Sequence, residues 1–184
     1  MNAWLEKALH DVAADATALR TLFPAVGRRV GRGPSATPGW TVDDVARVRL
    51  LRAAPGAAAE MPDLYRYGDA AEKRAVLHGL SELDTADIGD AGLELVADAL
   101  RTNDTRLVTA AMGEYAATHL DAAAYRHGVL KCVFMGIPLA GIAGLARRTD
   151  GELRRMLRSF AAERTAAGRE VPADLLPLLH EQDA

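Results

Sequence analysis

Tyr65, Arg66 and Asp69 bring a phenol, a guanidinium group and a carboxylate together at the junction of two predicted helices. Such groups can form the wall of a polar pocket, because phenols donate hydrogen bonds and guanidinium groups bind carboxylate or phosphate. The same residues also suit a structural corner, in which Asp69 caps the next helix and the tyrosine covers its neighbour. Local sequence favours the corner, and the pocket is the functional alternative.

Arg101 and Asn103 lie at a second helix junction, just before Asp104. Asp98 precedes Arg101 by three residues, which is the spacing of an intrahelical ion pair. We expect Asn103 to take the left-handed conformation of a helix end, after which Asp104 begins the next helix. A ligand-facing arginine and asparagine pair is the functional alternative to this structural role.

His127 and Lys131 are four residues apart and share one face of a predicted helix. Lys131 lies in the run VLKCVF, so we expect its side chain to be partly buried. A buried lysine can act as a base, a Schiff-base nucleophile or an anion clamp. The alternative is that the aliphatic part of the Lys131 side chain lies along apolar surface while its ammonium group is in water or in a salt bridge. We expect Cys132 to fill space in the core rather than act as a nucleophile.

Arginines are concentrated in two segments, residues 28–52 and 147–169, which hold 13 of the 19 in the chain. In the second segment we expect a solvated face with intrahelical ion pairs. The functional alternative is a cluster around one helix corner that binds an anionic ligand, formed by Arg147, Arg148, Arg154, Arg155 and Arg158. The acidic residues from 82 to 98 are interpreted as a solvated helix face.

Composition excludes several classes of protein. The net charge of −3 provides no general attraction to nucleic acid, and no apolar run approaches the roughly 20 residues that span a bilayer. Phosphate-binding loops, dinucleotide fingerprints and zinc spacings are absent from the sequence, so we expect no metal and no cofactor. A single cysteine precludes an intrachain disulfide. Together with an N-terminus too polar for a signal peptide, it favours a cytoplasmic protein.

Helices are expected to position all of these side chains. Alanine makes up 37 of the 184 residues and aromatic residues only 5%, a balance that favours helices over strands. Apolar residues recur at helical spacing almost throughout, and four aspartates precede such segments as N-caps. We expect an all-α fold of about nine or ten helices. The first choice is an irregular α-solenoid of HEAT-like stacked helix pairs, and a compact multi-helix bundle is the alternative.

Proline, glycine and capping residues predict several boundaries. Pro24 is expected to end the first helix, Pro62 to interrupt a short one, and Thr41 to begin a helix through a capping box with Asp44. The predicted ranges are a first helix over 3–23, a loop over 27–39, a short helical piece over 57–67, a helix over 89–102, and a short helix over 138–145.

The C-terminal two thirds of the chain resembles the EboA family. The resemblance rests on four stretches: LYRYGDAAEKRAVLHGL (64–80), DALRTND (98–104), RHGVLKCVFMGIPLAGIAGLARRTDGELRRM (126–156) and FAAERTAAGREVPADL (160–175). They lie within a family-like core over residues 40–178. Residues 1–40 add an N-terminal helix and a loop rich in Arg, Gly and Pro, and we expect residues 1–184 to form a single domain.

The resemblance implies a small all-helical protein encoded in bacterial secondary-metabolite gene clusters. It implies a non-catalytic or accessory role in making or exporting a cyclitol or prenylated metabolite, in which the protein binds an anionic or polar intermediate or a partner enzyme. One alternative is an enzyme that acts on a sugar phosphate or cyclitol phosphate with Lys131 as base or Schiff-base residue. The other is a helical-repeat scaffold for protein–protein contacts.

The family pattern falls on polar residues of this chain: Arg66, Asp69, Arg101, Asn103, Lys131, Arg148, Arg155, Arg164 and Arg169. Relatives have Asn-Gln where this chain has Arg126-His127, which favours Lys131 over His127. The predicted ligand-binding set is Tyr65, Arg66, Asp69, Arg101, Asn103, His127, Lys131, Arg148 and Arg155. The expected partners are a small polar or phosphorylated metabolite and other proteins encoded in the same cluster, without nucleic acid.

Overall fold

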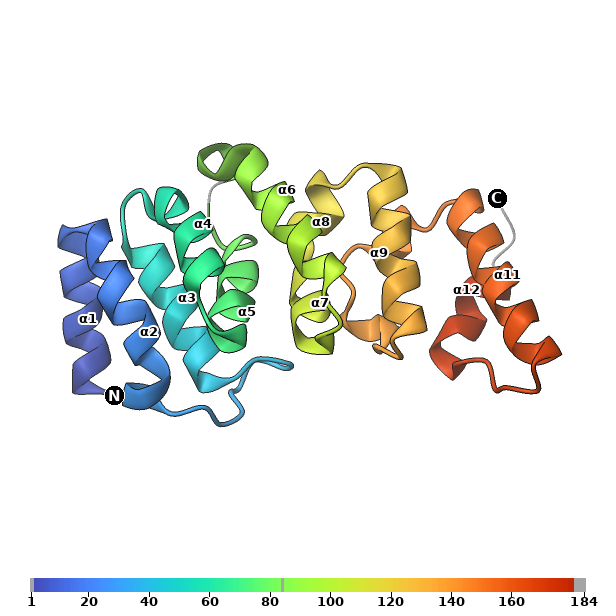
Figure 1. Cartoon of the computed structure of the whole chain (residues 1–184), viewed down its shortest axis with the longest axis horizontal. Helices are drawn as coiled ribbons and strands as arrows, with labels where there is room; N and C mark the ends of the chain where they lie inside the picture. The colour runs from blue at the N-terminus through green and yellow to red at the C-terminus, as the bar shows by residue number, and fades with distance from the viewer. Residues whose placement is uncertain (1, 84, 181–184) are drawn as a thin grey trace. The chain divides into compact units, whose positions relative to one another are not determined.

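The computed structural model describes residues 2–83 and 85–180, and the regular elements of that part of the chain are all helical (Figure 1). The described residues form twelve α-helices, close to the nine or ten predicted, and three short 3-10 segments. In the same residues, Pro34 and Thr41 form an isolated antiparallel β-bridge. The all-α prediction is therefore confirmed.

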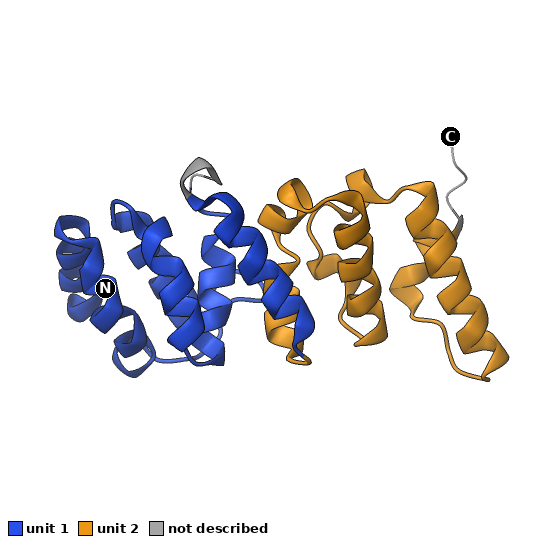
Figure 2. Ribbon diagram, turned by 45° about the horizontal axis from the view of Figure 1, so that its top comes forward, with its two compact units in different colours: residues 1–102 blue, residues 103–184 orange. Residues whose placement is uncertain are grey.

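Contacts between Cα atoms divide the chain into two compact units, Met1–Thr102 and Asn103–Ala184 (Figure 2). The expectation of a single domain over residues 1–184 stays a prediction. Unit 1 contains α1 (Ala3–Ala14), η1 (Ala16–Ala18), α2 (Leu19–Val30), α3 (Val42–Ala53), α4 (Ala57–Tyr67), α5 (Ala70–Gly79) and α6 (Thr85–Arg101).

Helices of unit 1 stack with alternate members in contact. α1 packs on α3 and α3 on α5, while α2 packs on α4 and α4 on α6. Successive helices such as α1 and α2, or α4 and α5, also pack on each other. This arrangement is that of stacked helix pairs. Its centre is filled by apolar side chains without exposed surface, among them Phe23, Leu50, Leu51, Val76 and Val96.

Unit 2 contains α7 (Thr105–Ala111), α8 (Glu114–His119), α9 (Ala122–Phe134), η2 (Leu139–Gly141), α10 (Leu145–Arg148), α11 (Gly151–Ala166), η3 (Ala173–Leu175) and α12 (Leu176–His180). α9 packs against both α7 and α11, and α12 packs on α11. The amide of Leu139 donates to Asp174 Oδ2 at 2.8 Å, which ties η2 to η3. Fully buried side chains on α9 and α11, including Val129, Leu153 and Leu157, form the core of this unit.

Aspartates begin the helices as the sequence predicts. Asp69 accepts hydrogen bonds from the amides of Ala71 and Glu72, both at 2.9 Å, and Glu72 completes a capping box. The predicted capping box of Thr41 and Asp44 also forms at the start of α3. Each remaining predicted N-cap accepts an amide hydrogen bond at the start of its helix: Asp104, Asp121 and Asp150.

Two of the predicted boundaries near the N-terminus are wrong. The helix expected over 3–23 is divided at Asp15, whose carboxylate accepts hydrogen bonds from the amide and hydroxyl of Thr17 and so starts a new turn. α2 then continues through Pro24 to Val30, and the loop begins at Gly31, where φ is 91°. Proline removes a backbone donor, but Phe23 and Val26 on either side of it are fully buried. Their packing explains why the helix continues.

Other predicted boundaries also shift. α4 runs uninterrupted through Pro62, and α6 begins at Thr85 with a kink at Gly89, where φ is 54°. The helix expected over 138–145 is replaced by η2 and α10, because Gly144 turns the chain with φ of 71° between them. Asn103 is not left-handed, since every positive φ in the described residues belongs to a glycine.

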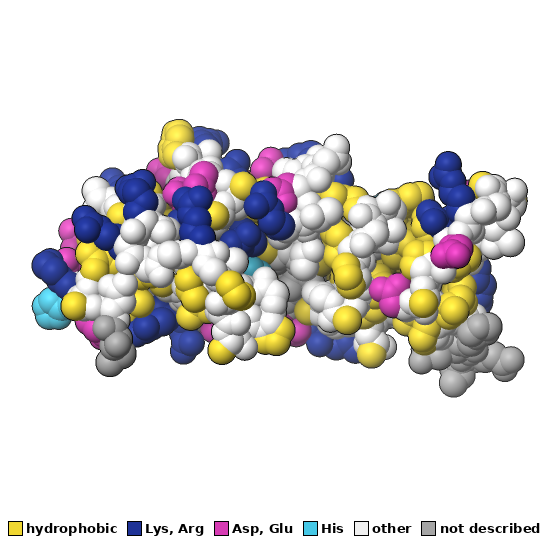
Figure 3. Space-filling view, turned by 90° about the horizontal axis from the view of Figure 1, so that it is seen from below, with side chains coloured by type: hydrophobic (Ala, Val, Ile, Leu, Met, Phe, Trp, Pro, Cys, Tyr) yellow, Lys and Arg dark blue, Asp and Glu magenta, His cyan; other side chains and the backbone are white. Residues whose placement is uncertain are grey.

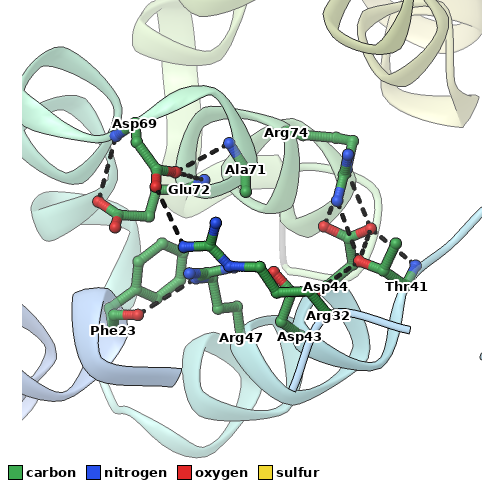
Figure 4. A network of polar contacts seen from close by, with 10 residues as sticks. All are labelled: Phe23, Arg32, Thr41, Asp43, Asp44, Arg47, Asp69, Ala71, Glu72 and Arg74. Carbon is green, nitrogen blue, oxygen red and sulfur yellow. Dashed lines mark hydrogen bonds and ion pairs between the residues drawn. The ribbon is translucent and has the colours of Figure 1, made fainter. Parts of the chain in front are cut away.

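A network of buried charges joins α2, α3 and α5 of unit 1 (Figure 4). Arg47 and Asp43 on α3 are both buried, with 2.7 Å between Nη1 and Oδ2. Arg47 Nε also donates to the carbonyl oxygen of Phe23 at 3.2 Å. Arg74 on α5 donates to both oxygens of the buried Asp44 at 3.0 Å. Arg47 belongs to the first arginine-rich segment, and the structure places its charge inside the protein rather than at a surface for anions.

Acidification is expected to destabilise unit 1 through His78. Its ring stacks on Trp40 at 4.2 Å between centroids, and its Nε2 is buried without a hydrogen-bond partner. Burial lowers the His78 pKa to about 4; the nearby Asp44 opposes this shift and Arg74 adds to it. In the unfolded chain this histidine becomes protonated as the pH falls through 6.5, whereas in the folded chain it stays neutral until about pH 4. The free energy of unfolding is therefore expected to fall by about 3 kcal/mol between these two pH values.

Urea unfolding between pH 7 and pH 4 measures this contribution. The His78→Gln variant is expected to lose less stability than the parent protein over the same range, because the other titrating groups are shared. Parallel stability curves for the two proteins would contradict the assignment.

Candidate functional site

A hollow of about 470 Å³ lies between α4, α5 and α6 of unit 1. We call it the α4–α6 hollow. Charged side chains of both signs line it around a buried phenol: Pro62, Asp63, Tyr65, Arg66, Lys73, Glu94, Leu95, Asp98 and Arg101. It therefore brings together three of the nine predicted ligand-binding residues, namely Tyr65, Arg66 and Arg101.

Helical spacing places these groups on the hollow. Glu94, Asp98 and Arg101 follow one another at intervals of four and three residues, so they share one face of α6. Tyr65 and Arg66 are adjacent in the last turns of α4, and Lys73 lies in the first half of α5, which Asp69 caps. The capping box at Asp69 thus has a positional role, because it fixes where the helix that carries Lys73 begins.

Tyr65, Asp98 and Arg101 form a hydrogen-bonded cluster in the lining of the hollow. The Tyr65 hydroxyl donates to Asp98 Oδ2 at 3.1 Å, and Arg101 Nη2 donates to Oδ1 of the same carboxylate at 3.1 Å. Burial, and then the hydrogen bond to Asp98, raise the Tyr65 pKa well above its ordinary value. The phenol therefore stays protonated at neutral pH. Each Asp98 oxygen retains a lone pair that can accept a hydrogen bond from a ligand.

The cations of the hollow differ in what they already bind. Lys73 Nζ lies 5.0 Å from the centroid of the Tyr65 ring, in a cation–π contact. Arg101 is paired with Asp98, although 71% of its side chain is exposed. Arg66 is exposed, and no described residue forms a hydrogen bond or ion pair with its side chain. Its guanidinium group is thus free to bind a carboxylate or phosphate.

A second hollow, of about 290 Å³, shares Asp63 with the first and is lined also by Arg20, Pro24, Glu60, Leu64, Tyr67, Gly68 and Glu72. Arg20 donates two hydrogen bonds to Glu60, at 2.8 and 3.0 Å, so its charge is already compensated. Unit 2 has a larger and more open hollow of about 710 Å³, lined mainly by apolar residues of η2, α10 and α12. Neither contains a residue of the predicted ligand-binding set.

Asp69 has the structural role that the local sequence favours. One carboxylate oxygen caps α5, and the other lies 3.5 Å from the guanidinium group of Arg32. The four predicted residues of unit 1 therefore divide into three that line the α4–α6 hollow and one that positions α5.

The arginines of the second rich segment bind separate partners within unit 2. Arg148 donates to the carbonyl oxygens of Ala117 and Leu120 at the end of α8, and lies over the Tyr125 ring. Arg155 pairs with Glu152 on its own helix at 2.7 Å, and Arg147 pairs with Glu114. On the face drawn in Figure 3, basic side chains are interspersed with acidic ones. The ion-pair interpretation thus describes these arginines better than a common anion site.

The other predicted residues of unit 2 are dispersed along the chain. Asn103 lies in the turn before α7, and His127 is exposed on α9. Lys131 is half-buried, as the sequence predicts, and no described residue forms a hydrogen bond or ion pair with it. Its role as a base or Schiff-base residue stays a prediction. Cys132 is fully buried, and burial raises its pKa to about 11, so the thiol is protonated at neutral pH.

Within residues 2–83 and 85–180, no three His, Cys, Asp or Glu side chains are grouped so that they could hold a metal ion. None of the helices there combines the length and the apolar character that crossing a membrane requires.

Stacked helix pairs and a polar hollow define a class of small all-α protein. Residues 32–180 match the family model described as metabolite traffic protein EboA, and the chain belongs to this family. The family description associates the protein with metabolites, in agreement with an accessory role. The matched range includes every residue that lines the α4–α6 hollow. Comparisons with curated proteins and with solved structures gave no match.

Four charged residues line the hollow but lie outside the predicted ligand-binding set: Asp63, Lys73, Glu94 and Asp98. The acidic residues up to Asp98 are predicted to form a solvated face, although the spacing of Glu94, Asp98 and Arg101 places two carboxylates and a guanidinium group on one side of α6. Lys73 gave no such signal, because only the packing of α5 beside α4 brings it to the Tyr65 ring.

Proposed function

We propose that this protein binds a small polar or anionic metabolite in the α4–α6 hollow, as a carrier or accessory protein of a secondary-metabolite pathway. The observation that supports this most directly is Arg66, whose side chain pairs with no described residue and lines a hollow that also holds Tyr65, Asp98 and Arg101. Membership of the metabolite traffic family supports the same function.

The size of the hollow suits a small molecule. Ligand pockets for small molecules enclose roughly 300–1,000 Å³, and the volume of about 470 Å³ falls in this range. Arg66 offers a planar fork of donors for a carboxylate or phosphate group. Asp98 can accept hydrogen bonds from ligand hydroxyl groups, while Arg101 and Tyr65 hold it in place.

The protonated phenol favours binding over chemistry at this site. Tyr65 donates to Asp98 and has a raised pKa, so it acts as a fixed hydrogen-bond donor rather than as a general base at neutral pH. A site of this kind orients a ligand without changing it, as a carrier requires.

Replacing Arg66 with alanine is expected to weaken metabolite binding roughly 10- to 100-fold, because a hydrogen bond to a charged group contributes about 1.5–3 kcal/mol. Titration calorimetry against a panel of sugar, cyclitol and prenyl phosphates measures the change. The control is Arg106→Ala, which removes an exposed arginine of unit 2 that is paired with Asp104.

The control variant is expected to bind as the parent protein does. Equal weakening by Arg66→Ala and Arg106→Ala would show that general charge, and not the α4–α6 hollow, attracts the ligand. Failure of the parent protein to bind any compound of the panel would overturn the proposed function.

A further inference from the structure

Charges around the α4–α6 hollow are balanced. Its lining contains three cationic and three acidic side chains, which are Arg66, Lys73 and Arg101 against Asp63, Glu94 and Asp98. Tyr65 is a neutral phenol. The hollow as a whole therefore has no excess of positive charge for a ligand that carries negative charge alone, and the selectivity must come from where the unpaired charges lie.

The charged groups of the hollow differ in how far other described residues already compensate them. Asp98 and Arg101 compensate each other, and Lys73 lies against the Tyr65 ring. Arg66 on α4 has no hydrogen bond or ion pair with a described residue, and the same is true of Glu94 on α6. A free guanidinium group and a free carboxylate thus line the same hollow from two different helices.

We propose that the α4–α6 hollow is selective for zwitterionic metabolites, with Arg66 binding the phosphate or carboxylate of the ligand and Glu94 binding its ammonium group. This inference rests on the proposed function and specifies its ligand class. A ligand with only an anionic group leaves Glu94 and Asp63 as like charges nearby, and one with only an amine meets Arg66 and Lys73. Such like-charge contacts disfavour the wrong ligands and so contribute to selectivity.

Glu94, rather than an aromatic ring, is the group that recognises the amine. Aromatic faces bind ammonium groups well, but the face of Tyr65 is already in contact with the protein's own cation, Lys73, at 5.0 Å. Asp63, which likewise has no hydrogen bond with a described residue, also interacts with the charge of Arg20. Glu94 is therefore the carboxylate with the least competition.

Four probes separate the two charges of the ligand: glucosamine 6-phosphate, glucose 6-phosphate, glucosamine and glucose. Calorimetry with the full chain near pH 6.5 keeps the amine protonated. We expect glucosamine 6-phosphate to bind at least 10-fold more tightly than glucose 6-phosphate. Glucosamine, which has only the amine, and glucose, which has no charge, are also expected to bind more weakly than glucosamine 6-phosphate.

A substitution at Glu94 tests the assigned residue. In Glu94→Gln the preference for glucosamine 6-phosphate over glucose 6-phosphate is expected to disappear, while the affinity for glucose 6-phosphate is retained or increased. The matched control is Glu163→Gln, the same change at an exposed position of α11 in unit 2, which is expected to retain the preference.

The outcomes distinguish this inference from the proposed function. Equal affinity of the parent protein for the two phosphates, or an unchanged preference in Glu94→Gln, would overturn the zwitterion assignment and leave the proposed metabolite binding intact. Absence of binding by all four probes and by the whole phosphate panel would overturn the proposed function itself.

Discussion

Replacing Asp43 with alanine is expected to lower the free energy of unfolding by about 3–5 kcal/mol, because the change leaves a buried charge without its partner. The Arg47 side chain is fully buried, and its Nη2 already lacks a hydrogen-bond partner. Arginine does not lose its proton in proteins, so the group cannot escape by becoming neutral. Burial by itself raises the Asp43 pKa, but the hydrogen bonds from Thr41 and Arg47 together hold it below its usual value, so the carboxylate is charged at neutral pH.

Lys7 and Asp11 provide a matched control for this prediction. They form an ion pair at the same i,i+4 spacing with 2.6 Å between Nζ and Oδ2, but 74% of the lysine side chain is exposed. Asp11→Ala is therefore expected to cost no more than about 0.5 kcal/mol. Urea unfolding followed by tryptophan fluorescence measures both variants, since Trp4 and Trp40 both belong to unit 1. Similar losses in the two variants would contradict the role assigned to burial.

A second variant tests whether the orphaned charge is the cause. Adding Arg47→Met to Asp43→Ala removes that charge and replaces it with an apolar side chain of similar length. The double variant is expected to be more stable than Asp43→Ala alone. A double variant that is less stable would place the effect in the hydrogen bond from Arg47 to the carbonyl of Phe23.

Gly144→Ala is expected to lower the stability of unit 2 by about 2–5 kcal/mol, as the sum of backbone strain and overpacking. Gly144 has φ of 71°, a conformation that side chains disfavour. An added Cβ would also lie 2.7 Å from the Cβ of Ala117 on α8, which is closer than packed carbon atoms approach. Because neither atom belongs to a flexible side chain, backbone of α8 or α10 must move.

Gly136 separates the two contributions. Its φ of 68° is almost the same, but an added Cβ would meet no atom within 4 Å. Gly136→Ala is therefore expected to cost only the strain, about 1–2 kcal/mol. Thermal unfolding followed by circular dichroism measures both substitutions. A loss of stability in Gly144→Ala no larger than in Gly136→Ala would show that the contact with Ala117 relaxes freely.

Local features of the fold were predictable from the sequence. Capping aspartates, the box at Thr41 and the glycine at position 168, which follows α11 with φ of 65°, act through hydrogen bonds and backbone conformations within a few residues. Such signals do not depend on the rest of the chain. The alanine-rich, strand-poor composition predicted the fold class for the same reason.

Features decided by packing were not predictable in this way. Pro24 has the local character of a helix terminator, and the burial of Phe23 and Val26 overrides it. Arg47 has the character of a surface arginine, and only the approach of α2 brings the Phe23 carbonyl and its ring to the guanidinium group. In both cases contacts with another segment of the chain provide the stabilisation that the local sequence lacks.

The residues of the candidate site likewise differ in whether local sequence or packing places them in the hollow. Tyr65, Arg66 and Arg101 carry polar groups at helix ends, a local signal that the structure gathers into one hollow. Lys73 and Glu94 reach that hollow only through the packing of α5 and α6 against α4. Arg148 was predicted from its charge, but the free carbonyl groups at the end of α8 bind it.

The burial of Cys132 gives the protein an intrinsic probe of its own fluctuations. A thiol reagent can attack this sulfur only after α9 separates from its neighbours, because the side chain has no exposed surface. The labelling rate of the folded protein, divided by that of the unfolded chain, then yields the free energy of local opening around a single atom. Both tryptophans lie in unit 1 and the lone thiol lies in unit 2, so one sample reports on the two units through separate signals.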